Sequence, residues 1–216
     1  HIAADPQKDQ SYVLYTLSQE ALDRCLFPVG DLVKFDVREI ASRYGLAVAE
    51  KPDSADICFV PNGDYREFVG SRVPDRPGTI IDRDGTVLGE HLGVQTFTVG
   101  QRRGLGVTTG EPMFVTSLDP VDNVVRLGRE EDLACTSFRT SETHWFVTPP
   151  VGGLAAQVRV RYHGAELSGR VTVTSPDEAL VTLDRPARAA APGQAAVFYV
   201  GQRVVGGGTI QAARDW

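Results

Sequence analysis

The chain has 216 residues, of which 42% are hydrophobic and 23% are charged, and its formal net charge is −6 at pH 7. This composition is typical of a globular protein, and the net negative charge argues against a generally adhesive nucleic-acid binder. No apolar run approaches the roughly 20 residues that a membrane-spanning helix needs. We therefore expect a cytoplasmic protein without a membrane partner.

The first 59 residues have a helical pattern. Val13, Leu14 and Leu17 are spaced three to four residues apart, and Ser18 is expected to cap a second helix that ends before Pro28. Asp36 is expected to cap a third helix, which Gly45 would end. Its apolar face comprises Val37, Ile40, Ala41 and Tyr44.

Residues 60–140 change to short strands and glycine-rich turns. Asp84-Gly85 predicts a hairpin between residues 79–81 and 86–88, and residues 94–99 alternate as a half-buried strand does. Beyond residue 140 almost no helical pattern remains. Six short strands are predicted there, and closing them into a small antiparallel barrel would remove exposed edges; they span residues 143–147, 154–162, 166–174, 179–183, 194–199 and 202–212.

The predicted fold class is thus mixed and mainly β. We expect three domains: a helical segment at residues 1–59, a small β-rich domain at residues 60–140, and a C-terminal antiparallel β-barrel at residues 141–216.

Three cysteines, Cys25, Cys58 and Cys135, lie far apart, with no CxxC pair and no cysteine–histidine cluster. Neither a structural zinc site nor a secreted disulfide framework is predicted, which fits a reducing compartment. Cys25 lies among apolar residues and is expected to pack there. Cys58 lies where helical sequence gives way to strands, so it is either a small core residue or a reactive thiol at a domain edge.

Two stretches combine arginine with groups that suit RNA. The loop at residues 100–106 has three glycines and two arginines, which fits phosphate binding and a solvated hairpin loop equally well. Arg159 and Arg161 would share one face of a strand, beside Tyr162. That face could contact phosphates and stack on bases, or it could be a solvated outer face of the barrel.

An ordered set of motifs resembles the tRNA-specific 2-thiouridylase family along nearly the whole chain. No single motif decides this resemblance, but the order and spacing of the set are specific. The motifs are Lys8-Asp9-Gln10-Ser11-Tyr12, Leu26-Phe27-Pro28-Val29-Gly30, Asp53-Ser54-Ala55-Asp56-Ile57-Cys58-Phe59, Arg76-Pro77-Gly78, Gly89-Glu90-His91, Val99-Gly100-Gln101-Arg102-Arg103-Gly104-Leu105-Gly106, Arg161-Tyr162, Pro192-Gly193-Gln194-Ala195-Ala196-Val197-Phe198-Tyr199 and Gly206-Gly207-Gly208.

The resemblance implies ATP-dependent transfer of sulfur to C2 of the wobble uridine in tRNA. Cys58 would carry the sulfur as a persulfide, which is a better nucleophile than a thiol. The donor would be a cysteine desulfurase or a sulfur-relay protein, and the substrates would be tRNAs for lysine, glutamate and glutamine. The resemblance also implies that tRNA is contacted by Lys8, Asp9, Gln10, Arg161, Tyr162 and Gln194.

The chain departs from the family in one large way, because it has no Ser-Gly-Gly-x-Asp-Ser phosphate loop. In the family that loop belongs to an N-terminal domain, which binds ATP and Mg²⁺ and carries a first cysteine able to form a disulfide with the second. Neither Cys25 nor Cys135 occupies that position. We therefore expect a C-terminal fragment without its own cofactor or metal site, inactive alone. The alternative is a non-catalytic RNA-binding module with a translation-factor-like barrel.

A smaller departure lies next to the sulfur-carrying position. Ala55-Asp56 stands where the family commonly has Thr-Gly. Glycine there would allow a backbone conformation that is costly for aspartate, so the shape of this loop is expected to differ.

Overall fold

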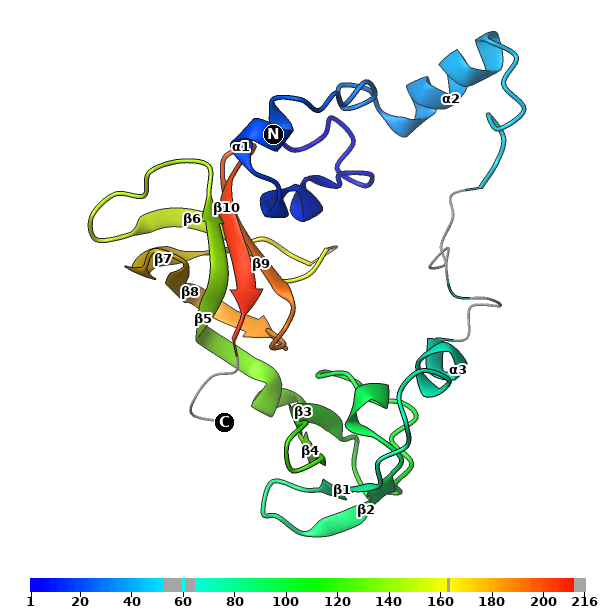
Figure 1. Cartoon of the computed structure of the whole chain (residues 1–216), viewed down its shortest axis with the longest axis vertical. Coiled ribbons are helices and arrows are strands. Elements are labelled where there is room, and N and C mark those ends of the chain that lie inside the picture. Colours follow the sequence, from blue (N-terminus) through cyan, green and yellow to red (C-terminus); the bar gives the residue numbers. More distant parts are fainter. Residues whose placement is uncertain (53–59, 61–64, 163, 212–216) are drawn as a thin grey trace. The chain divides into compact units, whose positions relative to one another are not determined.

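A computed structural model describes residues 1–52, 60, 65–162 and 164–211, with the backbone alone for residues 65–67. The chain forms two compact units, and we describe each by itself (Figure 1). The first unit consists of residues 1–53 and 136–215, and the second consists of residues 54–135. Among the described residues, none of the helices has the length and apolar character needed to cross a bilayer.

The first unit contains a closed six-stranded barrel, in the order β10-β5-β8-β7-β6-β9. The predicted barrel and the mainly β fold class are confirmed. The pairs β5–β10, β9–β10, β6–β9, β6–β7 and β7–β8 are antiparallel. Most of the fully buried side chains of the barrel are β-branched, aromatic or alanine. The strands are β5 (Ala134–Trp145), β6 (Leu154–Arg159), β7 (Leu167–Ser175), β8 (Glu178–Arg188), β9 (Ala195–Val200) and β10 (Arg203–Ile210).

Strand β9 is apolar along most of its length because both of its faces are covered. Val197 and Tyr199 pack with Tyr12 in one cluster, while the alternating residues Ala196 and Phe198 are fully buried as well. Successive side chains of a strand point to opposite faces, so a run without polar residues indicates a strand buried on both sides. The outer cover is supplied by residues from the start of the chain.

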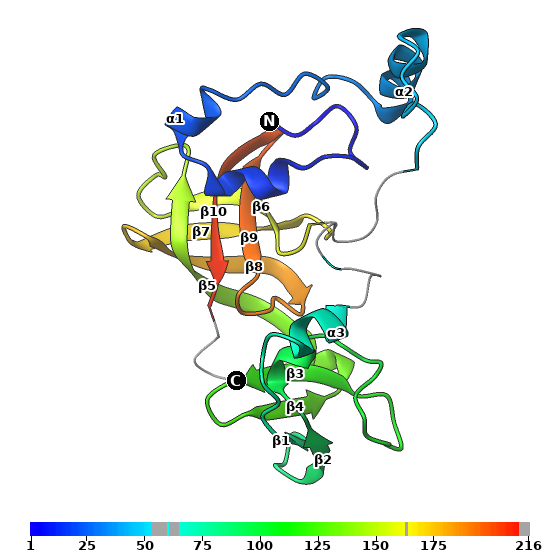
Figure 2. The same ribbon diagram turned by 45° about the vertical axis from the view of Figure 1, so that its right-hand side comes forward.

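This cover is the 3-10 helix η1 (Ser11–Thr16), which lies against β9 and β10 (Figure 2). After it, Ser18 caps helix α1 (Gln19–Leu22) as predicted, with its hydroxyl accepting a hydrogen bond from the Ala21 N–H. Helix α2 (Lys34–Arg43) is also where the sequence predicts it. It begins after Val33, however, so Asp36 lies in its first turn and is not the cap. A carboxylate in the first turn interacts favourably with the helix dipole.

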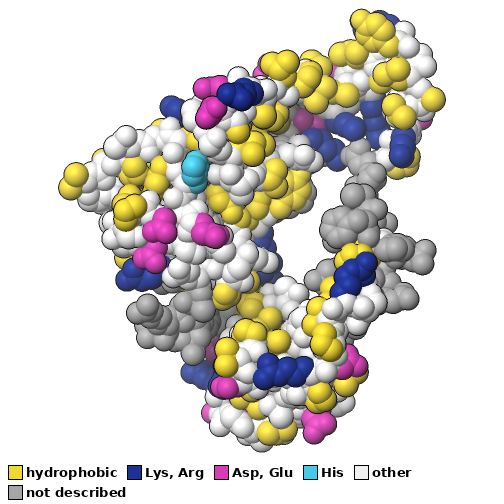
Figure 3. Space-filling view, in the orientation of Figure 1, with side chains coloured by type: hydrophobic (Ala, Val, Ile, Leu, Met, Phe, Trp, Pro, Cys, Tyr) yellow, Lys and Arg dark blue, Asp and Glu magenta, His cyan; other side chains and the backbone are white. Residues whose placement is uncertain are grey.

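The apolar face predicted for α2 exists, but none of its residues is buried. The side chains of Phe35 and Tyr44 are 74% and 76% exposed, and Leu26 before the helix is 89% exposed. Figure 3 shows hydrophobic side chains on the surface over α2 and the adjoining segment, at the upper right. The expectation that Cys25 packs in this region is wrong, because Cys25 is exposed.

The second unit is built on a four-stranded sheet in the order β2-β1-β4-β3, in which β1 and β4 pair in parallel. Its core contains Ile80, Val115, Val125 and Leu127, all fully buried. The hairpin predicted at Asp84-Gly85 is confirmed as the β1–β2 turn. The elements are α3 (Tyr65–Gly70), β1 (Gly78–Ile81), β2 (Val87–His91), η3 (Val94–Thr96), β3 (Phe114–Asp119), β4 (Val124–Gly128) and η4 (Glu130–Leu133).

The strand predicted at residues 94–99 is wrong, because the structure has the 3-10 turn η3 there. Thr96 N–H donates to the Gly93 carbonyl, and Phe97 N–H donates to the Val94 carbonyl. These local bonds curl the chain, and the apolar side chains still face the core of this unit. The alternation of apolar residues was therefore real, but it did not come from an extended backbone.

Candidate nucleic-acid interface

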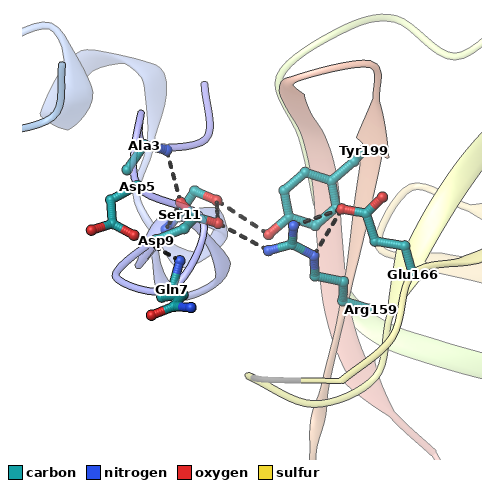
Figure 4. Close-up of polar contacts among 8 residues, drawn as sticks. All are labelled: Ala3, Asp5, Gln7, Asp9, Ser11, Arg159, Glu166 and Tyr199. Carbon is teal, nitrogen blue, oxygen red and sulfur yellow. Dashed lines mark hydrogen bonds and ion pairs between the residues drawn. The ribbon is translucent and has the colours of Figure 1, made fainter. Parts of the chain in front are cut away.

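Asp9 is the centre of a polar network that joins the start of the chain to the barrel (Figure 4). Its Oδ1 accepts hydrogen bonds from the backbone N–H groups of Ala3 at 3.0 Å and Ser11 at 3.1 Å. Its Oδ2 accepts from the Ser11 hydroxyl and from Arg159 Nη1, both at 2.9 Å. Burial alone would raise the pKa of Asp9, but these bonds outweigh it and hold the pKa below its ordinary value.

Arg159, at the end of β6, is held from the barrel side as well. Its guanidinium donates two hydrogen bonds to Glu166 Oε1, at 2.6 and 3.1 Å, and lies 4.5 Å from the centre of the Tyr199 ring. Burial lowers the pKa of Arg159, but the hydrogen bonds to Glu166 and Asp9 raise it by more. The side chain is only 16% exposed. The alternative of a solvated outer face is therefore wrong for Arg159, because its guanidinium forms ion pairs with two carboxylates of the protein, Asp9 and Glu166.

Tyr12 brings three of the predicted tRNA-binding residues to one place. Its hydroxyl donates to the Ala195 carbonyl at 2.6 Å, next to Gln194, and its ring meets the Tyr162 ring edge-on, with centroids 6.2 Å apart. Burial raises the pKa of Tyr12 to about 12, although the charge of nearby Arg161 acts in the opposite direction. Arg161 Nη2 donates to the Ala189 carbonyl at 3.3 Å.

The six predicted tRNA-binding residues thus lie in the first unit, on three segments: residues 8–10 of the N-terminal segment, residues 161–162 after β6, and residue 194 before β9. Lys8 and Gln10 are exposed and Asp9 is buried, while Arg161 and Gln194 are half-buried. Tyr162 is 36% exposed. The bridging roles of Tyr12, Ser11 and Tyr199 were not predicted, although Ser11 and Tyr12 belong to the same motif as Lys8, Asp9 and Gln10.

Cys58, the predicted persulfide carrier, lies outside the described residues, so its role stays a prediction. His163 also lies outside them. In the part of the chain that the structure does describe, Cys25 and Cys135 form no disulfide.

The glycine-rich loop at residues 100–106 belongs to the second unit and is ordered by a glutamine. Gln101 accepts a hydrogen bond from the Thr98 N–H at 3.0 Å and donates to the Arg103 carbonyl at 2.9 Å. Beside this loop is an open groove of about 560 Å³, whose wall includes Arg102, Thr108 and Met113. Phosphate binding by the loop remains a prediction.

The described residues do not fit a nucleotide–metal centre. Among them no three histidine, cysteine or carboxylate side chains gather so as to hold a metal ion. The sequence also has no Ser-Gly-Gly-x-Asp-Ser phosphate loop. None of the described residues is therefore assigned to ATP or Mg²⁺.

Three family models match successive ranges of the chain. The tRNA methyl transferase HUP domain matches residues 1–62, the tRNA methyl transferase PRC-barrel domain matches residues 66–129, and the aminomethyltransferase beta-barrel domain matches residues 135–210. These ranges lie close to the three domains expected from the sequence, whose boundaries at residues 59 and 140 stay a prediction.

Curated relatives are similar to the chain over almost its full length. A protein of Moorella thermoacetica named tRNA-specific 2-thiouridylase MnmA is 45% identical over 96% of this chain and 59% of its own length. Proteins of the same name from Desulforudis audaxviator and Roseiflexus castenholzii are 45% and 46% identical, over 98% and 99% of this chain and 62% and 58% of their own lengths. The chain thus spans about three fifths of the length of these relatives.

Proposed function

The chain belongs to the tRNA-specific 2-thiouridylase family, and from this premise we propose that it is the tRNA-gripping and sulfur-carrying part of such an enzyme. The observation that carries the proposal is the similarity at about 45% identity over nearly all of the chain. The reaction is transfer of sulfur to C2 of the wobble uridine. The substrates in this proposal are tRNAs for lysine, glutamate and glutamine.

The barrel unit is the part that binds tRNA in this proposal. Lys8 and Gln10 are exposed on the N-terminal segment. Arg161 and Tyr162 lie beyond the end of β6, and the Tyr162 ring contacts Tyr12 of the N-terminal segment. A cation, an amide and an aromatic ring are groups that contact phosphates and stack on unpaired bases. Such a local cationic surface is compatible with a net charge of −6, because binding depends on where the charges lie.

Cys58 is the sulfur carrier in this proposal. Its thiolate would attack the outer sulfur of a persulfide on the donor protein, breaking the donor's S–S bond and forming a new one on Cys58, while the donor leaves as a thiolate. The donor is a cysteine desulfurase or a sulfur-relay protein. ATP and Mg²⁺ are bound outside these 216 residues, so the purified chain is expected to accept sulfur but not to form 2-thiouridine.

Mass spectrometry tests the carrier role. The purified chain is incubated with a cysteine desulfurase and cysteine, and the peptide that contains Cys58 should gain the mass of one sulfur atom. Cys58→Ser should abolish the gain, while Cys25→Ser, which removes an exposed thiol elsewhere, should leave it unchanged.

Binding of a tRNA transcript is measured beside sulfur loading. tRNA binding without loading at Cys58 would favour the non-catalytic RNA-binding module instead. Failure of both measurements would overturn the proposed function. Formation of 2-thiouridine by the purified chain would contradict the expectation that it is inactive alone.

A further inference from the structure

Three consecutive residues of the N-terminal segment alternate in exposure. Lys8 and Gln10 are exposed, whereas Asp9 between them is only 5% exposed. The resemblance assigns all three to tRNA contact, but they do not face the same way. Asp9 points toward Arg159 and the barrel (Figure 4). Its two neighbours are open to solvent.

Asp9 has little capacity left for a ligand. A carboxylate offers about four lone-pair positions, and Asp9 already accepts four hydrogen bonds from Ala3, Ser11 and Arg159. Its negative charge would also repel a phosphate, whereas here it forms an ion pair with Arg159. Both facts argue against a direct contact between Asp9 and RNA.

Arg159 is held in place by other residues of the barrel, so it offers Asp9 a fixed partner. Glu166, which lies just before β7, accepts a hydrogen bond from the same guanidinium, and the Tyr199 ring packs against the guanidinium. The Ser11 hydroxyl lies 3.3 Å from the Tyr199 hydroxyl, which adds a second polar link between the segment and β9. A buried ion pair with further hydrogen bonds of this kind fixes one arrangement of its partners.

We propose that Asp9 is a positioning residue: through Arg159 it anchors the N-terminal segment to the barrel and so holds Lys8 and Gln10 outward, toward the RNA. This inference rests on the proposed tRNA binding and deepens it. Lys8, and not Asp9, makes the phosphate contact of this motif.

The salt dependence of tRNA binding separates positioning from direct contact. Each phosphate contact that is lost lowers the slope of log Kd against log salt concentration by about 0.7–1. Lys8→Gln should lower the slope by that amount. Asp9→Asn keeps the side-chain volume but has one acceptor oxygen in place of two, so it cannot accept from both the backbone amides and Arg159. The anchor should therefore break, and the slope should fall by the same amount.

Two further variants complete the measurement. Lys8→Gln combined with Asp9→Asn should lower the slope no further than either change alone, because both remove one contact. Glu166→Gln is the matched control: it removes the other carboxylate on Arg159 but leaves the N-terminal segment attached, so the slope should not change. Circular dichroism confirms that each variant is folded.

The possible results are distinct. An affinity loss in Asp9→Asn without a change of slope would indicate a direct, uncharged contact and would overturn the inference, while tRNA binding by the unsubstituted chain would still stand. Unchanged affinity and slope in Asp9→Asn would overturn it too. Failure of the unsubstituted chain to bind tRNA would overturn the proposed tRNA binding together with the inference.

Hydrogen exchange tests the anchor without RNA. The amides of Ala3 and Ser11 donate to Asp9, so they should exchange faster in Asp9→Asn than in Glu166→Gln. Equal exchange in the two variants would contradict the anchor. Should Asp9→Asn not fold, Ser11→Ala replaces it. This change removes the hydroxyl bond to Asp9 but keeps the ion pair, and it should shift both measurements less and in the same direction.

Discussion

Gly207 of β10 lies directly against the ring of Tyr15. A Cβ atom on Gly207 would lie 2.7 Å from Tyr15 Cδ2 and 2.9 Å from the Ala196 carbonyl oxygen, both closer than carbon atoms approach in folded proteins. The absence of a side chain therefore lets η1 pack against the barrel. This gives a physical reason for at least one glycine of the Gly206-Gly207-Gly208 motif.

Gly207→Ala is expected to destabilise the first unit by about 1–3 kcal/mol, the usual cost of overpacking a tight contact. The free energy of unfolding in urea measures this. Gly110→Ala is the control, because nothing lies within 4 Å of a Cβ at that position. Equal stability of the two variants would mean that η1 does not pack tightly on β10.

Tyr12 is expected to ionise late, because burial raises its pKa to about 12. An unfolded chain loses this proton near pH 10. The contribution of Tyr12 to stability is therefore complete below about pH 10 and is lost as the pH rises through the folded pKa. Ultraviolet absorbance of tyrosinate during alkaline titration should show a late step that Tyr12→Phe diminishes. An identical titration curve in Tyr12→Phe would contradict this assignment.

The second unit should lose stability in mild acid because of His91. Its Nδ1 accepts a hydrogen bond from the Gly93 N–H at 3.0 Å, and burial lowers its pKa more strongly than the nearby Asn123 carbonyl raises it. The unfolded chain then takes up a proton before the folded chain does. Stability is present above about pH 6.5, the ordinary value, and falls as the pH drops below it.

Urea unfolding at pH 7.5 and 5.5 measures this effect. His91→Gln should reduce the difference between the two pH values, while His144→Gln, at an exposed position of the first unit, should leave it unchanged. A pH dependence that survives His91→Gln would assign the effect to another group.

Truncation of two phenylalanines to alanine should change the free energy of unfolding by very different amounts. Phe198 of β9 is fully buried, so Phe198→Ala is expected to cost about 3–5 kcal/mol of unfolding free energy. Phe35 on α2 is 74% exposed, so Phe35→Ala should change it by less than about 0.5 kcal/mol. Urea denaturation of both variants provides the comparison. A large loss in Phe35→Ala would show that α2 is covered by something in solution.

The barrel could be predicted from the sequence because its strands are short stretches, either alternating or continuously apolar, that turns separate. The same pattern at residues 94–99 was misleading. There, side chains pack toward one core from a 3-10 turn, and hydrogen bonds within the segment, not apolar periodicity, decide the backbone.

The candidate site could be predicted only in part, because residue types do not reveal partners that lie far away in the chain. Asp9 and Arg159 are separated by 150 positions. Both are charged, and charged residues are ordinarily expected at the surface. Only the fold shows that they form an ion pair. Tyr12 illustrates the same limit: its neighbours Tyr162 and Ala195 come from segments that nothing local connects with it.

The position of η1 on the outside of β9 has a consequence for how this protein is made. Tyr12 and Ala195, whose carbonyl it binds, are 183 positions apart in the chain, so Tyr12 is synthesised well before the surface that it covers. Until β9 and β10 have emerged, its aromatic side chain lacks this native surface. Contacts between such distant parts of a chain form slowly, and apolar surface exposed meanwhile favours aggregation. The nascent chain is therefore at greatest risk of aggregation in the interval before β9 and β10 are complete.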